Sequence, residues 1–337
     1  MPLNEFIPLR YRDGARRMAL ALQHMDRVLI AAHAHPDGDA LGSVAAAGYL
    51  LRCLGKNFFL YVTPRVPHDL SFMPLPGIQL SALDRLPFTH RSALLLDCGE
   101  PHRLGQDLAK CLPQWVTVNI DHHPGGNGMG SMDNWIEPEA AATAQLIAYV
   151  ALEAGIPLEG ELATAIALGL VTDTGGFRHG NTTPDMLRLT ALLVENGCHL
   201  AALRDQLDNN WTLERMRLWG LLMSRVTVRR QNTIAFCSVS LKDLTVSKAT
   251  KEDLEGFVEH MRKLRDVRAA ALLREDAPGC CKFSLRSSGS VDVRQAAATL
   301  GGGGHRNAAG GTLHMSMHEA EESLTTALSQ ALESGGY

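Results

Sequence analysis

The sequence predicts an α/β fold with two lobes, a larger N-terminal domain built on a parallel sheet and a smaller α/β domain at the C-terminal end. A chain of 337 residues suits two domains of roughly 100–200 residues each better than one core. Short apolar runs typical of strands alternate with helical stretches along its first half. This alternation indicates parallel strands with helices on both faces of the sheet.

The expected strands of the first domain are short apolar runs that end near glycine, proline or charged residues. They cover 27–33, 58–62, 92–96 and 116–120. An amphipathic pattern predicts a helix over 15–26, and further helices are expected at 41–54, 140–154, 160–172 and 184–196.

The same patterns suggest where the domains divide. We expect a first domain at 1–195, a helical linker at 196–225 and a second domain at 226–337. In the second domain, strands are expected at 233–239, 269–274, 282–286 and 312–315, and helices at 251–262, 293–299 and 317–333. The glycine-rich segment 301–311 is predicted to be a loop.

Composition narrows the class of protein. With 45% hydrophobic and 20% charged residues, the chain is typical of soluble globular proteins, and no apolar run reaches the roughly 18 residues of a membrane span. The N-terminal segment carries charges where a signal peptide would be apolar, so a cytoplasmic location is expected. Seven cysteines without a CxxC pair favour reduced thiols over disulfides or a zinc-thiolate site.

The charge balance bears on the kind of partner. A net charge of -4 and a pI near 6.4 predict no broad basic surface, whereas binding to a long duplex depends on many Lys and Arg contacts with phosphates. Any nucleic-acid substrate is therefore expected to be short, and neither a membrane nor a long duplex is an expected partner.

Aspartate and histidine residues recur at the positions where predicted strands or helices end. These residues are His33, Asp37, Asp39, Asp97, Asp121, His122, His123 and Asp173. The carboxyl ends of parallel strands meet at one edge, where ligands of such sheets bind. A single Asp-Gly-Asp is usually a surface turn, and a single His-His pair is usually solvated. Turn chemistry does not explain their recurrence at successive element ends, so we expect one metal site.

Oxygen ligands with a minority of imidazoles suit Mn²⁺ or Mg²⁺ better than an ion that prefers thiolates. Even four of these carboxylates are more than one cation neutralises, whereas two cations about 3.5–4 Å apart could share a bridging carboxylate. Asp97 is the natural bridge. The predicted cofactor is two Mn²⁺ ions, with Mg²⁺ or Co²⁺ as alternatives, which would activate a water molecule for attack on a phosphorus atom.

Two features of the second domain are candidates for anion binding. Glycines in the segment 301–311 let backbone N–H groups approach an anion, although a flexible turn is the commoner meaning of such a run. Arg286 carries a guanidinium suited to bidentate phosphate contacts, and an exposed arginine at a strand end is the competing interpretation.

These motifs resemble the DHH phosphoesterase superfamily. The resemblance is carried by HAHPDGDALGS at 33–43, Asp97, DHH at 121–123, VTDTG at 171–175 and the glycine-rich segment 301–311, which is similar to the DHH-associated C-terminal domain. It spans nearly the whole chain, and the motifs occur in the family's order. Size and layout are most similar to the nanoRNase/pAp phosphatase (NrnA-like) group rather than to the larger RecJ exonucleases.

The resemblance implies six metal ligands, with His33 and Asp37 on one ion, Asp39, His122 and Asp173 on the other, and Asp97 bridging both. Asp121 is implied to orient the histidine pair without binding a metal. Asp97 and His123 are the implied catalytic residues. His123 would donate a proton to the leaving group or stabilise its charge.

The resemblance also implies that the second domain holds the terminal nucleotide or phosphate in a cleft between the domains. The matching positions are Arg286, Gly303, Gly304, His305, Arg306, Asn307 and Ala308. Of these, Arg306 and Asn307 match the family pattern less closely.

The function expected from this resemblance is Mn²⁺-dependent hydrolysis of short oligoribonucleotides, together with 3′-phosphoadenosine 5′-phosphate. The direction of attack stays open, and a homodimer is implied by resemblance alone. An alternative is a signalling phosphodiesterase for cyclic or linear dinucleotides. A different class is a non-catalytic nucleotide-binding regulator, which tight nucleotide binding without hydrolysis in saturating Mn²⁺ would distinguish.

Overall fold

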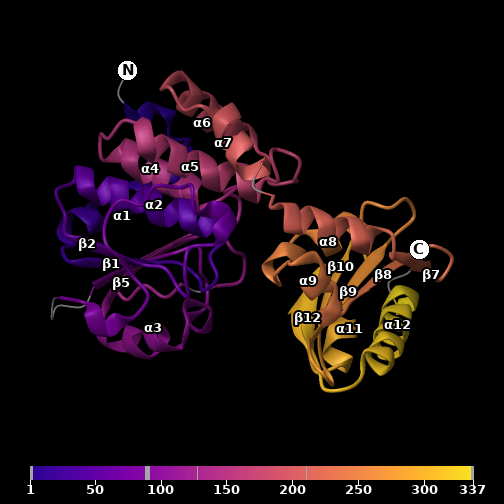
Figure 1. Ribbon diagram of the computed structural model, residues 1–337. Coiled ribbons are helices and arrows are strands. Elements are labelled where there is room, and N and C mark those ends of the chain that lie inside the picture. Colours follow the sequence, from indigo (N-terminus) through magenta and orange to yellow (C-terminus); the bar gives the residue numbers. More distant parts are fainter. Residues whose placement is uncertain (1–2, 88–91, 127, 210, 335–337) are drawn as a thin grey trace. The chain divides into compact units, whose positions relative to one another are not determined.

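The computed structural model describes residues 3–87, 92–126, 128–209 and 211–334 (Figure 1). The chain forms two compact units, Met1–Asn210 and Trp211–Tyr337. Each contains a six-stranded sheet with helices packed on it, which confirms the predicted α/β class. The segment predicted as a linker, 196–225, holds two helices, α7 (Leu200–Asp208) in the first unit and α8 (Leu213–Met223) in the second.

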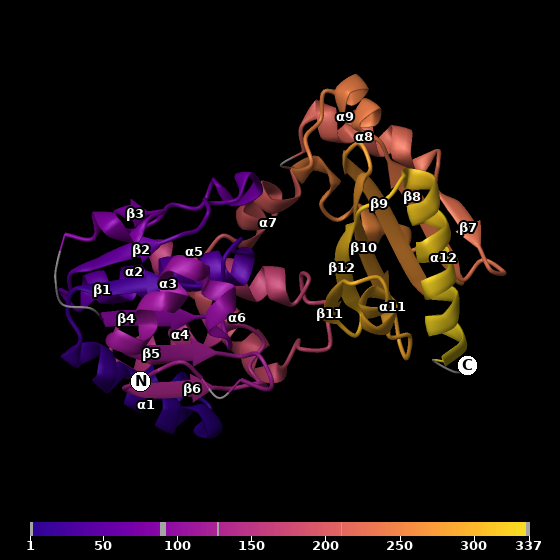
Figure 2. The same cartoon turned by 90° about the horizontal axis from the view of Figure 1, so that it is seen from below.

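The sheet of the first unit is parallel throughout, in the order β3-β2-β1-β4-β5-β6, as Figure 2 shows. Its strands are β1 (Val28–Ala31), β2 (Phe58–Tyr61), β3 (Gln79–Leu80), β4 (Ser92–Leu96), β5 (Val116–Asp121) and β6 (Asp133–Ile136). Every residue of β1 and β4 is buried. Strands covered on both faces have continuous apolar sequences, which is why these two were recognisable.

Helices cover both faces of this sheet, and the α-helices before α7 are α1 (Leu9–His24), α2 (Gly38–Cys53), α3 (Gln106–Cys111), α4 (Thr143–Glu153), α5 (Gly160–Asp173) and α6 (Pro184–Glu195). Figure 1 shows α1, α2, α4 and α5 on one side and α3 on the other. Val28 and Ile30 belong to the core beneath the first group, and Leu29 and Ala31 belong to the core that includes Leu108 of α3. This alternation is the period of two expected of a strand.

The sheet of the second unit has the order β11-β12-β10-β9-β8-β7, with β8 and β9 parallel and the other neighbouring pairs antiparallel. The strands are β7 (Thr227–Arg229), β8 (Ile234–Val239), β9 (Ala269–Ala277), β10 (Cys280–Ser287), β11 (Gly303–His305) and β12 (Ala308–Leu313). The helices besides α8 are α9 (Leu241–Ser247), α10 (Phe257–Met261), α11 (Val293–Thr299) and α12 (Met317–Ser334). One core lies beneath α11 and α12, and another beneath α8, α9 and α10.

Two predictions for the second unit were wrong in detail. The expected helix at 251–262 is a 3-10 turn, Glu252–Leu254, followed by α10, because Gly256 adopts a left-handed φ of 79° and interrupts it. The predicted loop at 301–311 is a hairpin of β11 and β12, in which Gly303 pairs with Gly310. A Cβ on Gly302 would lie 2.4 Å from the carbonyl oxygen of Gly310, so the glycine permits this close approach.

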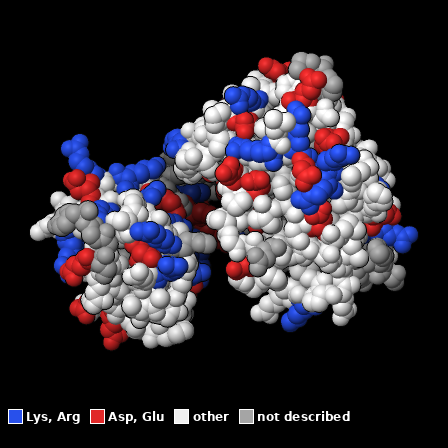
Figure 3. Space-filling view, turned by 180° about the vertical axis from the view of Figure 1, so that it is seen from behind, with Lys and Arg blue, Asp and Glu red and all other residues white. Residues whose placement is uncertain are grey.

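Surface charge is mixed on the face that Figure 3 draws, where Lys and Arg side chains lie among Asp and Glu side chains. All seven cysteines are free thiols. In the described ranges, no helix has both the length and the apolar character that crossing a membrane requires.

Candidate metal centre and active site

Three neighbouring parallel strands of the first unit deliver polar side chains to the same edge. Asp97 directly follows β4, Asp121 is the last residue of β5, and His33 lies two residues beyond β1. His122 and His123 continue from β5. Because β1, β4 and β5 are adjacent and parallel, their carboxyl ends coincide, as the sequence predicted.

Asp97 turns its two carboxylate oxygens toward different histidines. Its Oδ2 atom lies 3.6 Å from His33 Nε2, whereas its Oδ1 atom lies 3.5 Å from His122 Nε2 and 3.6 Å from His123 Nδ1. Asp97 is only 2% exposed, and its backbone has a left-handed φ of 53°. This conformation is uncommon for a non-glycine residue, and such residues are enriched at functional sites.

The first group of potential ligands is His33, Asp37 and Asp97, whose ligand atoms all lie within 4.8 Å of one another. His33 Nε2 is 3.7 Å from Asp37 Oδ2. These separations exceed hydrogen-bond length. They are close to the spacing of atoms that share an ion at about 2.0–2.2 Å, so this group could hold a cation.

The second group surrounds His122. Its Nε2 atom lies 3.8 Å from Asp39 Oδ2 and 3.8 Å from Asp173 Oδ2, in addition to the Asp97 contact. The other ring nitrogen, Nδ1, is 3.2 Å from the carbonyl oxygen of Ala140. A backbone acceptor for Nδ1 leaves Nε2 available as a ligand atom facing the carboxylates.

Electrostatics in this cluster favour bound cations. Burial alone would lower the pKa of His33, but the neighbouring carboxylates of Asp37 and Asp97 outweigh it and raise the pKa to about 10. Burial and the neighbouring carboxylates raise the pKa of Asp39 and of Asp173. Mutual repulsion of carboxylates is relieved by divalent cations, and this set of oxygens and imidazoles suits ions such as Mn²⁺ and Mg²⁺.

The first and last residues of the DHH motif form a pair. Asp121, which is fully buried, accepts hydrogen bonds at Oδ1 from His123 Nδ1 (2.8 Å) and from the His123 backbone N–H (3.2 Å). The hydrogen bond from the ring raises the pKa of His123, against the effect of burial. Its other ring nitrogen, Nε2, points away from Asp121.

Two residues that the sequence did not predict, Thr143 and Asn181, donate hydrogen bonds to carboxylates of the cluster. The hydroxyl of Thr143 donates to Asp97 Oδ1 at 2.9 Å. The side-chain amide of Asn181 donates to Asp173 Oδ2 at 3.0 Å and to the carbonyl oxygen of Ala141 at 2.9 Å. No local pattern marks either residue, because each acts on a partner that the fold brings near.

Of the residues predicted to bind substrate, Arg286 lies on β10 directly opposite Ala308 on β12. Its Nε atom is 2.6 Å from Glu259 Oε1, so the guanidinium already has an anionic partner. Gly303 and Gly304 lie on β11, the edge strand of this sheet.

Arg306 and Asn307 form the two-residue turn between β11 and β12. Arg306 donates to the carbonyl oxygen of Ser290 at 2.9 Å, and the amide of Asn307 donates to Ser287 Oγ at 2.8 Å. The backbone of His305 belongs to β11, whereas its side chain lies outside the described residues.

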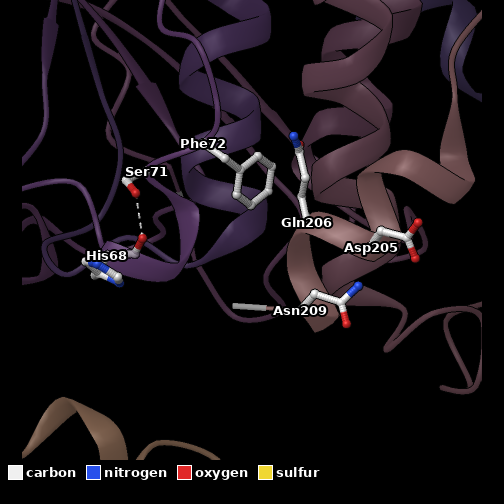
Figure 4. A pocket seen from close by; sticks show the side chains of 6 residues that line it. All are labelled: His68, Ser71, Phe72, Asp205, Gln206 and Asn209. Carbon is white, nitrogen blue, oxygen red and sulfur yellow. Dashed lines mark hydrogen bonds between the residues drawn. The ribbon is translucent and has the colours of Figure 1, made fainter. Parts of the chain in front are cut away.

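A pocket of about 340 Å³ lies elsewhere in the first unit, between the segment that follows β2 and α7 (Figure 4). Its lining residues are His68, Ser71, Phe72, Asp205, Gln206 and Asn209. None of these belongs to the aspartate and histidine cluster.

Sequence comparison matches parts of both units to known protein families. Residues 27–170 match the DHH family, N-terminal domain, and residues 236–334 match the DHHA1 domain. The chain belongs to the DHH family.

Among its relatives is the bifunctional oligoribonuclease and PAP phosphatase NrnA of Thermus thermophilus, which is 32% identical over 330 residues, 97% of each chain. An exopolyphosphatase-related protein from Bacteroides fragilis superposes with a TM-score of 0.86 at 26% identity, over 94% of this chain and 96% of that one. Exonuclease RecJ bound to manganese shares the fold, with a TM-score of 0.57 at 17% identity, over 97% of this chain and 96% of that one.

Proposed function

We propose that this chain is a two-metal phosphoesterase that hydrolyses short oligoribonucleotides and removes the 3′-phosphate of 3′-phosphoadenosine 5′-phosphate. The observation that carries the proposal is the orientation of Asp97, with Oδ2 toward His33 and Oδ1 toward His122. A carboxylate placed in this way suits a bridge between two cations. Membership of the DHH family and a relative named for both activities support the substrate class.

The proposed ligands of the two ions are His33, Asp37 and Asp97 for one, and Asp39, Asp97, His122 and Asp173 for the other. When bound, two Mn²⁺ ions would supply an activated water molecule and neutralise charge on the phosphoryl oxygens. Asp39 and Asp97 are nearly completely buried, which keeps the two carboxylates in fixed positions.

His123 is the proposed proton donor to the leaving ribose oxygen. Asp121 holds the ring through Nδ1, and Nε2 would then be the nitrogen that faces the substrate. A donor whose ring orientation is fixed by a buried carboxylate needs little reorganisation when the bond to the leaving oxygen breaks. Asp121 is proposed to orient His123 without binding a metal.

For recognition of the substrate end, we propose Arg286, Gly303, Gly304, His305 and Ala308, with Arg306 and Asn307 as further contacts. The guanidinium of Arg286 would contact a phosphate. Backbone N–H groups along the glycine-rich edge strand β11 would approach the same terminal group, because no Cβ stands in the way.

The test is hydrolysis of 5′-labelled oligoribonucleotides from dinucleotides to a 24-mer, alongside 3′-phosphoadenosine 5′-phosphate and a cyclic dinucleotide, in Mn²⁺. We expect preferential cleavage of the shortest RNAs and loss of activity in Asp97→Ala. Asp107→Ala, at an exposed position on α3, is the matched control and should retain activity. Equal cleavage of all lengths, or cleavage of the cyclic dinucleotide alone, would contradict the proposal.

A further inference from the structure

Thr143 is the first residue of α4, and its side chain is fully buried. The preceding residue, Ala142, contributes no side-chain hydrogen bond to cap the helix. Instead, Asp39 on α2 accepts the backbone N–H groups of Thr143 (2.6 Å) and Ala144 (3.0 Å). These backbone donors at the helix N-terminus have no partner within the helix and are satisfied by a carboxylate of the metal cluster, which fixes Thr143 beside that cluster.

The hydroxyl of Thr143 contacts a second carboxylate of the cluster, that of Asp97. It donates to Asp97 Oδ1 at 2.9 Å. Rotation of an aspartate carboxylate about its terminal bond has a broad energy minimum, so the side chain alone does not fix which way its oxygens face. With Oδ1 held by the hydroxyl, Oδ2 faces His33 at 3.6 Å while Oδ1 remains 3.5 Å from His122.

We propose that Thr143 is a positioning residue that sets the bridging orientation of Asp97, so that both metal positions form together. This inference rests on the proposed two-metal function. The backbone N–H of Thr143 holds Asp39 and its hydroxyl holds Asp97, so one residue fixes a carboxylate in each of the two ligand groups. Substitution of the Thr143 side chain removes only the hydrogen bond to Asp97 and leaves the backbone hydrogen bond to Asp39 in place. The effect of the hydroxyl can therefore be measured by itself.

The experiment measures Mn²⁺ binding to the whole protein by electron paramagnetic resonance of the free ion, without substrate, followed by kcat and KM on a diribonucleotide. Thr143→Val should raise the Kd for Mn²⁺ by roughly 10–100-fold, as expected when a group that orients a ligand is lost. Thr143→Ser keeps the hydroxyl and should restore binding. KM at saturating Mn²⁺ should change little, because Thr143 contacts a ligand of the metal and not the substrate.

The matched control is Thr190→Val. Thr190 is also a buried helical threonine, and its hydroxyl donates to the carbonyl oxygen of Met186 at 2.9 Å, away from the cluster. Melting temperatures measured in the presence of a chelator show whether Thr143→Val and Thr190→Val fold. If Thr143→Val does not fold, Thr143→Ala replaces it in the binding measurement.

Two results would overturn the inference and leave the proposed function standing. One is unchanged Mn²⁺ affinity in a folded Thr143→Val or Thr143→Ala protein, and the other is an equal loss of affinity in Thr143→Ser. A wild-type protein that binds no Mn²⁺ would contradict the proposed function and the inference with it.

Discussion

Gly42 on α2 packs so closely against α5 that a Cβ at position 42 would lie 2.6 Å from the carbonyl oxygen of Ala165. Gly169 on α5 makes the reciprocal approach, because a Cβ there would lie 2.4 Å from Asp39 Oδ1. These two glycines let the helices that carry Asp39 and Asp173 approach each other. The geometry of the metal cluster therefore depends on helix packing as well as on the strand ends.

Gly42→Ala is expected to lower stability by about 1–3 kcal/mol, because the new methyl group meets backbone that cannot move aside cheaply. Gly220→Ala is the matched control, since Gly220 lies in α8 with no atom near its added Cβ. That change should stabilise the protein by about 1 kcal/mol through helix propensity. Thermal unfolding followed by circular dichroism measures both, and equal effects would contradict the packing argument.

Asn181 is expected to support metal binding through Asp173. Loss of its amide in Asn181→Ala should reduce Mn²⁺ affinity roughly 10–100-fold. Asn57→Ala provides the comparison, because Asn57 donates to Asp26 in a similar pair remote from the cluster. Calorimetric titration with Mn²⁺ distinguishes the two variants, and a wild-type affinity in Asn181→Ala would exclude this role.

Asp121→Asn is expected to reduce kcat on a diribonucleotide by roughly 10–100-fold, with little change in KM. The amide weakens the acceptor that orients His123 through Nδ1. His123→Ala should lower kcat at least as much, and combining the two substitutions should add little, because both act on the same proton transfer. Fully additive losses in steady-state kinetics would show that Asp121 acts by another route.

Stability of the second unit is expected to fall in acid through Asp243. Burial alone would raise the pKa of this carboxyl, but hydrogen bonds from Ser240 and the contact with Arg225 lower it. A depressed pKa in the folded state stabilises the fold at a pH above the unfolded pKa of about 4. That contribution is lost as the pH falls through the depressed value.

At neutral pH, Asp243→Asn should therefore cost about 1 kcal/mol, because Asp243 is the carboxylate that accepts from the Ser240 backbone N–H in the capping box of α9. Urea unfolding of the wild type and the variant at neutral pH and below pH 4 measures the difference. The gap between them should narrow in acid, and a constant gap would argue against the ionic contribution.

From the sequence, a site residue could be predicted when it lies next to a recognisable strand or helix. Asp97 and Asp121 could be placed at one sheet edge because each directly follows or ends a recognisable strand. Thr143 could not, since its partner Asp97 is 46 residues away and a threonine at a helix start has an ordinary explanation. The β11 and β12 hairpin was also missed, because glycine is rare in strands and its use here depends on a close neighbour.

The most direct test of the central claim is the number of Mn²⁺ ions bound per chain, measured by equilibrium titration of the metal-free protein. If Asp97 bridges two ions, the wild type binds two per chain, His33→Ala retains one, and Asp97→Ala loses high-affinity binding at both positions. A single high-affinity ion in the wild type, or two ions bound normally by Asp97→Ala, would contradict the two-metal centre.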